Sequence, residues 1–344
     1  MTPPPYAPSS TTQRRLAFKV LRALLIVALL ATVAYLAGPR NALGPLDPTT
    51  RIPPPQSVSA VDDWLRISES AYTDIKPGNA KGIVWNSAAH QRTPWSVVYL
   101  HGFSASRLET APLAETVAKA LGANVFYTRF TGHGRQGVAM GEATAQDWMA
   151  DTLEAVAIGQ TIGERVLVIS CSTGATLATL LATSSDGQRV SAHAFISPNF
   201  GPKNKKAELI NGPWGKQIAL ALEGDTRGWA PANAAEANAW SSRYPTRALF
   251  PMMAVVKTAR DSDLSKFKTP LLVLYSDQDE TVDPAETRAA FARIGTARKT
   301  LETITYSKAR GQHVLVGDIK DATATATMAQ SIAKWAQTLP TAQN

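Results

Sequence analysis

Short apolar runs alternate with stretches of helical periodicity from about residue 61 to the C-terminus. The apolar runs have the length of buried strands and lie at residues 82–85, 95–100, 124–130, 165–169, 192–196, 270–275 and 300–306. The stretches with helical spacing lie at residues 62–75, 110–121, 144–162, 284–294 and 321–339. This alternation predicts an α/β domain over residues 61–344.

The alternation breaks down at about residues 199–266. This stretch is rich in aromatic residues, methionines and prolines, Trp214 and Met253 among them. We interpret it as an irregular helical insertion. Its composition suits an apolar wall over a site on the sheet, with Trp214 and Met253 as candidate wall residues.

The N-terminal region has a different pattern. Residues 1–15 are rich in Pro, Ser and Thr and are expected to be a disordered cytoplasmic tail. Residues 23–38 contain no charged side chain, and Lys19 and Arg22 can snorkel, which extends the usable apolar helix back to Leu16. We therefore expect a transmembrane anchor over residues 16–38, with a cleaved signal segment as the alternative.

The charges around this segment predict its orientation. Four basic residues precede it and only Arg40 follows closely, so the N-terminus is expected to stay inside a bacterial-type inner membrane. The catalytic domain would then lie outside, in the periplasm or beyond the cell, or be secreted if the segment is cleaved. Residues 39–60 are rich in proline and are expected to form a semi-rigid linker that lifts the domain off the membrane.

Charge and cysteine content add two limits. The 344 residues carry a net charge of +8, and residues 1–60, with six basic side chains and one acidic, account for +5 of it. Since the folded region is only weakly basic, we expect no nucleic-acid partner. Cys171 is the single cysteine, which excludes an intrachain disulfide.

The most informative stretch surrounds Ser172. The apolar run at residues 165–169 precedes it, helix formers at residues 175–182 follow it, and Ser170 and Gly174 are small neighbours. A strand that turns sharply into a helix needs such neighbours, and it holds the corner hydroxyl beside the free N–H groups of the helix. We interpret Ser172 as a nucleophile, which requires a base, an acid and an oxyanion site elsewhere.

His313 is the expected base. It lies between the last strand and the last helix, and in a parallel sheet such a loop falls at the same edge as the serine turn. A loop histidine without these partners would be an ordinary surface residue. The orienting acid should follow the strand at residues 270–275, where Asp277, Asp279 and Asp283 all qualify. Asp283 resembles a helix N-cap and Asp277 can serve the turn, so we favour Asp279.

Two backbone N–H groups are expected to receive the oxyanion of an acyl-transfer intermediate. One is that of Thr173, directly after the nucleophile. The other is that of Phe103, in the loop after the strand at residues 95–100, where Gly102 lets the chain bend. We interpret His101 in this loop as a hydrogen-bonding residue that fixes the loop, and not as the base.

Residues 132–137 read Gly-His-Gly-Arg-Gln-Gly and match the G-x-G-x-x-G pattern of dinucleotide sites. In such sites the helix begins inside the motif. Here residues 138–143 intervene before the next helix, so we interpret the motif as a surface loop beside the site. No cluster of Cys, His and Asp has metal-ligand spacing. We therefore expect no cofactor and no metal.

Five motifs in this order resemble those of α/β hydrolases. They are the His-Gly-Phe loop at 101–103, Thr-Gly-His-Gly at 131–134, Ser-Cys-Ser-Thr-Gly at 170–174, Asp-Glu-Thr-Val at 279–282 and His-Val-Leu at 313–315. The chain most resembles the monoacylglycerol lipase and lysophospholipase-like serine hydrolases, which are grouped with serine aminopeptidase-like proteins.

This resemblance implies an α/β-hydrolase fold, with a mostly parallel central sheet, helices on both faces and a helical cap at about 199–266. It also supports Asp279 as the acid. The chain departs from the family pattern at Ser170, where glycine is usual, and at Cys171, where histidine is common.

The expected function is cleavage of carboxylic esters through an acyl-enzyme on Ser172. Candidate substrates are monoacylglycerols, lysophospholipids and short-to-medium acyl esters. An amide or peptide hydrolase, or an acyltransferase, is the alternative, and Glu208, Glu223 and Asp225 in the insertion could bind a substrate amine. A non-catalytic hydrolase-like binding protein is a further alternative, which the complete set of Ser172, Asp279 and His313 disfavours.

Overall fold

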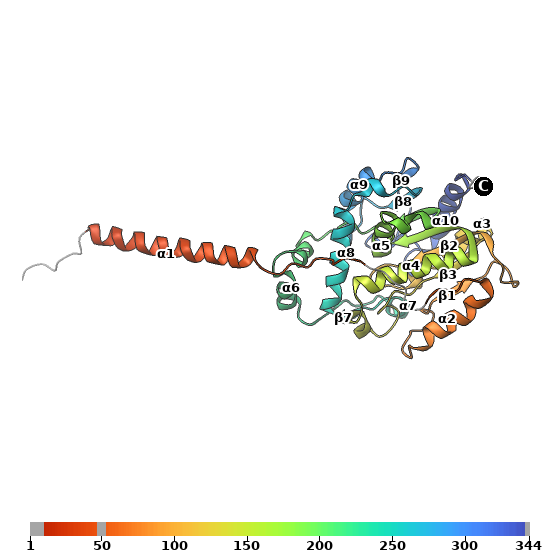
Figure 1. The fold of residues 1–344 in the computed structure, drawn as a ribbon, viewed down its shortest axis with the longest axis horizontal. Coiled ribbons are helices and arrows are strands. Elements are labelled where there is room, and N and C mark those ends of the chain that lie inside the picture. Colours follow the sequence, from red (N-terminus) through yellow and green to blue (C-terminus); the bar gives the residue numbers. More distant parts are fainter. Residues whose placement is uncertain (1–9, 47–52, 341–344) are drawn as a thin grey trace, which may run out of the picture.

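The computed structural model describes residues 10–46 and 53–340 (Figure 1). Helix α1 (Ser10–Leu36) projects away from a globular part that contains the other described elements. The two parts meet beside helix α6 (Gly215–Glu223) of the insertion.

A seven-stranded sheet forms the centre of the globular part. Its spatial order is β1-β3-β2-β4-β5-β8-β9, and β1 is antiparallel to β3 whereas the other neighbouring pairs are parallel. The strands are β1 (Gly82–Val84), β2 (Thr93–Leu100), β3 (Asn124–Tyr127), β4 (Gly163–Cys171), β5 (Ala192–Ile196), β8 (Leu271–Tyr275) and β9 (Lys299–Thr303). The mostly parallel sheet expected from the sequence is confirmed, and its carboxyl edge gathers the loops that follow β2, β4, β8 and β9.

Helices cover both faces of this sheet. Side chains of β2 alternate, so Val97 and Tyr99 join the core on one face while Val98 and Leu100 join the core on the other. Helices α3 (Leu113–Leu121) and α10 (Ala322–Gln337) pack on the first face. The second face is covered by α2 (Val61–Ser70), α4 (Ala145–Ile162), α5 (Thr173–Ala182), α8 (Leu249–Asp261) and α9 (Pro284–Arg293). Because both faces are covered, β4, β5 and β8 consist mostly of buried apolar residues.

The insertion lies between β5 and β8. It contains α6, β6 (Thr226–Gly228), α7 (Ala234–Ala239), β7 (Arg243–Pro245) and α8, with β6 and β7 paired antiparallel. Ile210, Tyr244 and Met253 share a small apolar core of its own. Helix α8 also contributes Val255 to the core of the sheet, so it fastens the insertion to the main body.

Helix α1 is long and apolar enough to cross a membrane, judged by length and composition. The segment Gln13–Leu36 has 24 residues, and its most apolar window of 18 residues has a mean hydropathy of 2.3 and is not buried. The helix begins at Ser10, earlier than the boundary of residue 16 that was expected. Arginine is a good helix former, so the charges of Arg14 and Arg15 end the apolar segment without ending the helix. The rest of the expected disordered tail, residues 1–9, lies outside the described residues.

The described parts of the segment between α1 and α2 contact the globular part, whereas a semi-rigid linker that lifts the domain off the membrane is expected from the sequence. Asn41 is buried, and Leu43 packs against the main core. At the other end, the Trp64 indole N–H donates to the Pro53 carbonyl at 2.9 Å. Proline content predicted stiffness, but it carries no information about where a segment docks. Residues 47–52 lie outside the described residues.

Candidate active site

Ser172 stands at the corner between β4 and α5. Its backbone has φ 51° and ψ −117°, a left-handed region that non-glycine residues rarely adopt. The Ser172 N–H donates to the Ile196 carbonyl at 3.0 Å, which fixes the corner to the neighbouring strand. At Gly174 an added Cβ would lie 2.2 Å from the Leu100 carbonyl oxygen, so glycine is required there. The backbone therefore has the form of a nucleophile elbow.

The two departures from the family pattern are accommodated inside the protein. Ser170 is fully buried, and its hydroxyl has no hydrogen-bond partner among the described residues. Cys171 is also fully buried, and burial raises the pKa of its thiol well above the usual value. A neutral, enclosed thiol is a poor nucleophile. Ser172 is thus the nucleophilic side chain of this turn that faces the cavity.

His313 contacts Ser172 directly. The His313 Nε2 lies 3.0 Å from the Ser172 Oγ, within hydrogen-bond reach. The loop between β9 and α10 that carries His313 is held by Gln312, whose amide donates to the Ser307 and Ala309 carbonyls at 3.0 and 2.9 Å. The base and the nucleophile are therefore held by separate rigid segments.

Asp279 is the carboxylate that His313 contacts. The His313 Nδ1 lies 2.7 Å from the Asp279 Oδ2. The second oxygen, Oδ1, accepts the backbone N–H groups of Thr281 and Val282 at 2.7 and 2.9 Å. The hydrogen bonds to Oδ1 fix the orientation of the Asp279 carboxylate. This orientation points Oδ2 at the His313 imidazole.

The two alternative aspartates have different partners. Asp277 forms a surface ion pair with Arg288. Asp283 caps α9 by accepting the Ala285 N–H at 2.9 Å. The structure confirms that Asp283 is a helix N-cap, as the proline after it predicts.

The N–H groups of Phe103 and Thr173 are available as donors. Both residues line the cavity over Ser172, and in the described part of the chain neither backbone N–H donates to another residue. The loop of Phe103 lies close to the nucleophile, since a Cβ added to Gly102 would lie 3.3 Å from the Ser172 Cβ. The two donors therefore come from the β2 loop and the start of α5.

His101 fixes this loop, in agreement with the sequence interpretation. Its Nε2 accepts the Phe130 N–H at 3.1 Å, so its Nδ1 carries the proton and donates to the Gly102 carbonyl at 2.9 Å. Burial lowers the pKa of His101 well below the usual value, which keeps the ring neutral. His101 has no contact with the Ser172 hydroxyl and acts as a support.

The Gly-rich stretch at 132–137 lies beside the site, as expected, but only part of it is a surface loop: Gln136 is exposed, whereas residues 132–134 are buried. His133 is buried, and its ring contacts those of His101, Phe103 and Trp148 at centroid distances of 5.0, 5.9 and 5.6 Å. At Gly132, with φ 80°, a Cβ would lie 2.6 Å from the Ala139 carbonyl oxygen. These glycines allow close packing behind the Phe103 loop, and α4 begins only at Ala145.

Glu109 is a supporting residue that the sequence did not reveal. It is 1% exposed, and its Oε1 accepts the Gly102 N–H at 2.6 Å and the Tyr99 hydroxyl at 2.9 Å. Burial raises the pKa of Glu109 to about 7, against the opposing effect of the Gly102 hydrogen bond. A single glutamate in a short turn gives no sequence signal of burial, so only the fold places it beneath the Phe103 loop.

We expect Glu109→Gln to remove a pH dependence of stability. In the wild type the pKa of Glu109 is raised in the folded state, so the free energy of unfolding falls as the pH rises from about 4.5 through about 7. The fall is on the order of 2–3 kcal/mol. The substituted glutamine keeps an oxygen that can accept the same two donors but has no proton to lose. Urea unfolding at about pH 5 and about pH 8 measures the difference, and an unchanged pH dependence in the variant would contradict the assignment.

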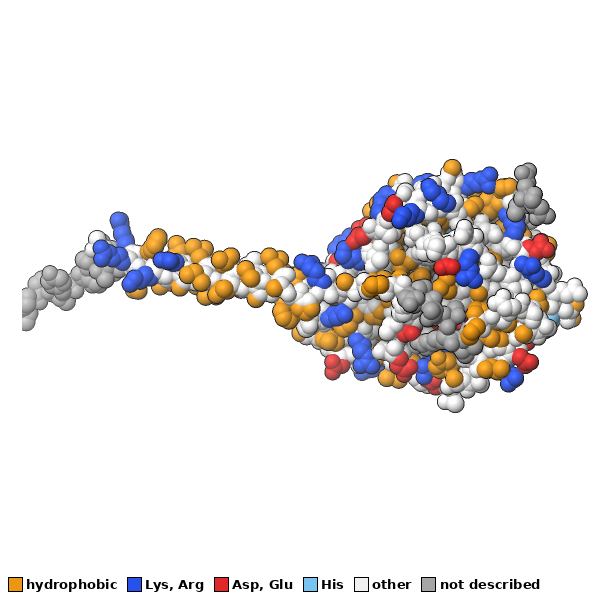
Figure 2. Space-filling view, in the orientation of Figure 1, with side chains coloured by type: hydrophobic (Ala, Val, Ile, Leu, Met, Phe, Trp, Pro, Cys, Tyr) orange, Lys and Arg blue, Asp and Glu red, His pale blue; other side chains and the backbone are white. Residues whose placement is uncertain are grey.

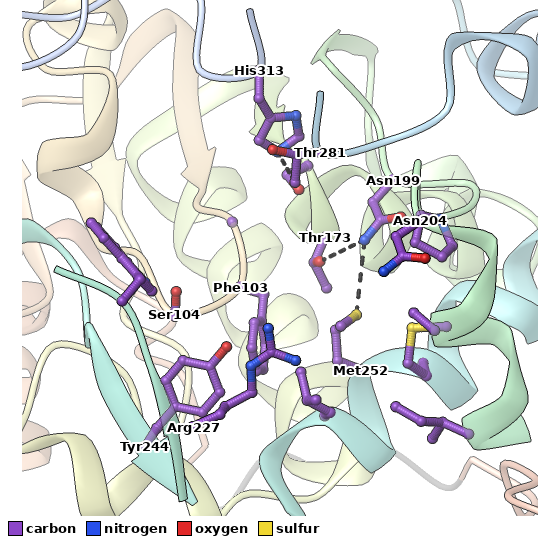
Figure 3. Close-up of a pocket in the computed structure, with 18 of the residues that line it drawn as sticks. Phe103, Ser104, Thr173, Asn199, Asn204, Arg227, Tyr244, Met252, Thr281 and His313 are labelled. Atoms are coloured by element: carbon purple, nitrogen blue, oxygen red, sulfur yellow. Dashed lines mark hydrogen bonds between the residues drawn. The ribbon is translucent and has the colours of Figure 1, made fainter. Parts of the chain in front are cut away.

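A cavity of about 690 Å³ lies over Ser172, between the sheet edge and the insertion. Figure 3 shows His313, Thr173 and Phe103 around the site, with Met252 and Tyr244 of the insertion facing them. Most of the other apolar lining comes from the insertion and includes Leu209, Ile210, Ile218, Leu222, Trp229, Leu249 and Met253. Met253 thus contributes to the wall, whereas Trp214 contacts the end of α1. A long apolar group fits such a cavity.

The same region defines the family of the chain. The family model for serine aminopeptidase, S33, matches residues 91–318, more than half of the chain and all of the site described above. The chain belongs to this family. A thermostable monoacylglycerol lipase from Bacillus sp. (strain H-257) is 26% identical over 216 residues, which cover 60% of this chain and 80% of that lipase.

Solved structures show the same fold. One, described with the metagenome-derived lipolytic enzymes LipS and LipT, is 21% identical and has a TM-score of 0.62, covering 76% of this chain and 99% of its own. A soluble variant of monoglyceride lipase from Saccharomyces cerevisiae is 12% identical with a TM-score of 0.59, covering 77% and 92%. The chain is therefore a lipase- and esterase-like α/β hydrolase, and the resemblance inferred from its motifs is confirmed.

Proposed function

We propose that this protein is a membrane-tethered serine hydrolase that cleaves carboxylic esters. The observation that carries the proposal is the continuous contact from Asp279 through His313 to Ser172, at the floor of an apolar cavity. Monoacylglycerols, lysophospholipids and short-to-medium acyl esters are the proposed substrates. The similarity to a monoacylglycerol lipase supports this choice.

The proposed reaction is acyl transfer through Ser172. His313 takes the hydroxyl proton as the Ser172 Oγ attacks the ester carbonyl, and Asp279 holds the imidazole in the required tautomer and stabilises its charged form. The N–H groups of Phe103 and Thr173 receive the oxyanion. His313 then protonates the departing alcohol, and the same residue activates water to release the acid from the acyl-enzyme.

The acidic groups of the insertion favour an ester over a substrate with a free amine. Glu208 is paired with Arg260 at 2.6 Å and does not line the cavity. Glu223 does line the cavity, but its Oε2 forms an ion pair with the Arg227 Nη1 at 3.9 Å. Asp225 is exposed and outside the lining. Among the described residues, the candidate amine-binding acids are thus either already paired or away from the cavity.

A substrate panel tests this proposal with the full chain in detergent micelles. We expect kcat/KM for monoacylglycerols and p-nitrophenyl esters to exceed that for aminoacyl amides by about 100-fold or more, because the lining is mostly apolar. Among its described acidic side chains, Glu223 and Glu236 face Arg227 and Lys320, and burial raises the pKa of Glu109 to about 7. A preference for aminoacyl amides would support the peptidase alternative instead. Absence of turnover on every ester and amide would support a binding protein.

The anchor and its orientation are part of the same proposal. We propose that α1 spans a bacterial-type inner membrane once, with its basic N-terminal end inside and the hydrolase domain outside. The basic side chains at the start of α1 and the apolar surface that follows them support this orientation (Figure 2). In intact spheroplasts the domain should remain with the membrane fraction. Protease added to the outside of these spheroplasts should digest it. A domain that is protected, or that is released to the medium intact, would contradict the proposal.

A further inference from the structure

The end of α1 is fastened to the insertion. The Trp214 indole N–H donates to the Ala34 carbonyl in the last turns of α1 at 3.1 Å. The Trp214 backbone N–H donates to the Pro39 carbonyl at 2.9 Å. Gly38 between them is buried, and a Cβ added there would lie 2.1 Å from the indole nitrogen. The indole thus lies flush against the chain where the helix ends.

A second contact follows three residues later. Asn41 is buried, and its amide donates to the Asn211 side-chain oxygen at 3.0 Å and to the Phe250 carbonyl at 2.9 Å. Asn211 in turn donates to the carbonyl of Met253, a residue that lines the cavity, at 3.2 Å. The segment after α1 is therefore joined through buried hydrogen bonds to the wall of the active-site cavity.

These contacts leave no spacer between a membrane and the domain. Residues 16–36 of α1 span about 32 Å as a helix, close to the ~30 Å of a bilayer hydrocarbon core. If α1 crosses a bilayer, its membrane-exit end coincides with Gly38 and Trp214. Tryptophan is enriched at this depth because its ring is apolar and its N–H is polar.

The insertion carries most of the exposed apolar surface of the globular part. Four of its large apolar side chains are exposed, namely Leu209, Trp214, Leu222 and Trp229, against only Ile67 and Val138 elsewhere among the described residues beyond α1. Leu209, Leu222 and Trp229 also line the active-site cavity. Figure 2 shows apolar surface continuing from α1 onto the adjoining end of the domain.

The cavity rim is close to the proposed membrane surface. Trp214 immediately precedes α6, and Leu222 lies eight residues further along that helix, or about 12 Å. Leu222 is 76% exposed, which is unusual for a leucine that also lines a cavity. The same short helix therefore carries the α1 contact at one end and the cavity rim at the other.

We propose that residues 38–46 clamp the insertion onto the bilayer that α1 spans, and that Leu209, Trp214, Leu222 and Trp229 form a membrane-contacting rim through which the ester enters from the lipid. This inference rests on the proposed membrane anchor. It replaces the expected semi-rigid linker, which would hold the domain off the membrane, by a fixed orientation with the cavity rim facing the lipid. The acyl chain of a bilayer ester then passes from lipid to cavity without crossing water.

Two features favour a lipid surface over a second copy of the chain as the partner. The rim is continuous with the C-terminal part of α1, residues 23–36, whose exposed apolar side chains need an apolar environment. Arg40 and Lys216 are exposed next to the α1–Trp214 contact, where basic side chains match anionic headgroups. A protein partner would have to cover α1 as well as the rim.

An environment-sensitive fluorophore tests the position of the rim directly. The full chain is reconstituted in vesicles of phosphatidylethanolamine and phosphatidylglycerol, and a dye is attached to Leu222→Cys or, as a matched control, to the exposed Ile67→Cys on α2. The native Cys171 is fully buried, so it does not compete for the label. We expect blue-shifted emission and quenching by brominated lipids at position 222 only. Equal emission at both positions, or a blue shift that brominated lipids do not quench, would overturn the proposal.

Two glycine variants test the clamp. Gly38→Val places a side chain inside the Trp214 ring, whereas Gly44→Val in the same segment meets nothing within 4 Å. We expect Gly38→Val to abolish the lipid quenching at position 222 and to lower hydrolysis of a vesicle-embedded monoacylglycerol about tenfold, through loss of effective concentration. Hydrolysis of a soluble p-nitrophenyl ester should be unchanged, and Gly44→Val should behave as wild type. Unchanged quenching in Gly38→Val would overturn the clamp.

The two readouts separate this inference from the proposed function. Quenching of the dye on Leu222→Cys, together with no ester hydrolysis by the unlabelled wild-type protein, would retain the membrane rim and reject the esterase. Protein that hydrolyses soluble esters but is not quenched would retain the esterase and reject the rim. Protein that fails to float with the vesicles would reject the anchor and the rim together.

Discussion

Ser172→Ala is expected to abolish ester hydrolysis and labelling by fluorophosphonates. The hydroxyl is the group in contact with the His313 Nε2, and the neighbouring Cys171 is buried with its thiol protonated. Loss of a serine nucleophile in such an arrangement lowers kcat by roughly 10⁴- to 10⁶-fold, and the residual rate comes from binding and oxyanion stabilisation. Active-site titration with a fluorophosphonate, together with kcat on a p-nitrophenyl ester, measures both effects.

Cys171→Ala is the control for this experiment. It removes the other nucleophilic atom of the turn while leaving the Ser172 hydroxyl and its partners in place. It should keep stoichiometric labelling and a rate within a few-fold of wild type, with a modest loss of stability from the small cavity it creates. Full labelling of the Ser172→Ala protein would show that another residue is the nucleophile.

The elements that carry this chemistry could be predicted because their signals are local. A buried strand followed by Ser-Cys-Ser-Thr-Gly and then helix formers encodes the elbow, since Gly174 is the residue that the close approach to Leu100 requires. His313 could be placed because loops after parallel strands share one sheet edge. Asp279 was harder to predict, because three aspartates follow the same strand. The structure separates them by giving Asp277 and Asp283 other partners.

Features that depend on distant contacts could not be predicted. Asn41 is polar and lies among prolines, so nothing in its neighbourhood indicates burial against Asn211, 170 residues away. His133 lies in a glycine-rich stretch that is typical of exposed loops, yet ring packing with Phe103 and Trp148 buries it. Glu109 becomes buried only because the Phe103 loop folds over it. In each case the partner that buries the residue comes from another element of the fold.

Asp279→Asn is expected to lower kcat about 10⁴-fold while the protein remains folded. The structure gives a specific reason. The Asp279 Oδ1 accepts two backbone N–H groups, from Thr281 and Val282, and an asparagine keeps this loop only by placing its carbonyl oxygen there. Its NH₂ group then faces the His313 Nδ1, which must act as the acceptor. The ring proton is forced onto Nε2, and that nitrogen can no longer take the proton of Ser172.

The matched controls are Asp277→Asn and Asp283→Asn. The ion pair of Asp277 with Arg288 is half-exposed and is worth at most about 1 kcal/mol, and asparagine caps a helix as well as aspartate does. Both variants should therefore keep kcat within about twofold of wild type, since neither side chain touches His313. Urea unfolding confirms that all three variants are folded, and kcat on a p-nitrophenyl ester compares them. A large loss of kcat in Asp277→Asn, with Asp279→Asn active, would transfer the role of the acid to Asp277. All three substitutions remove one negative charge, and only Asp279→Asn changes the group that faces His313. A loss of kcat confined to Asp279→Asn would therefore show that the tautomer of His313 sets the rate.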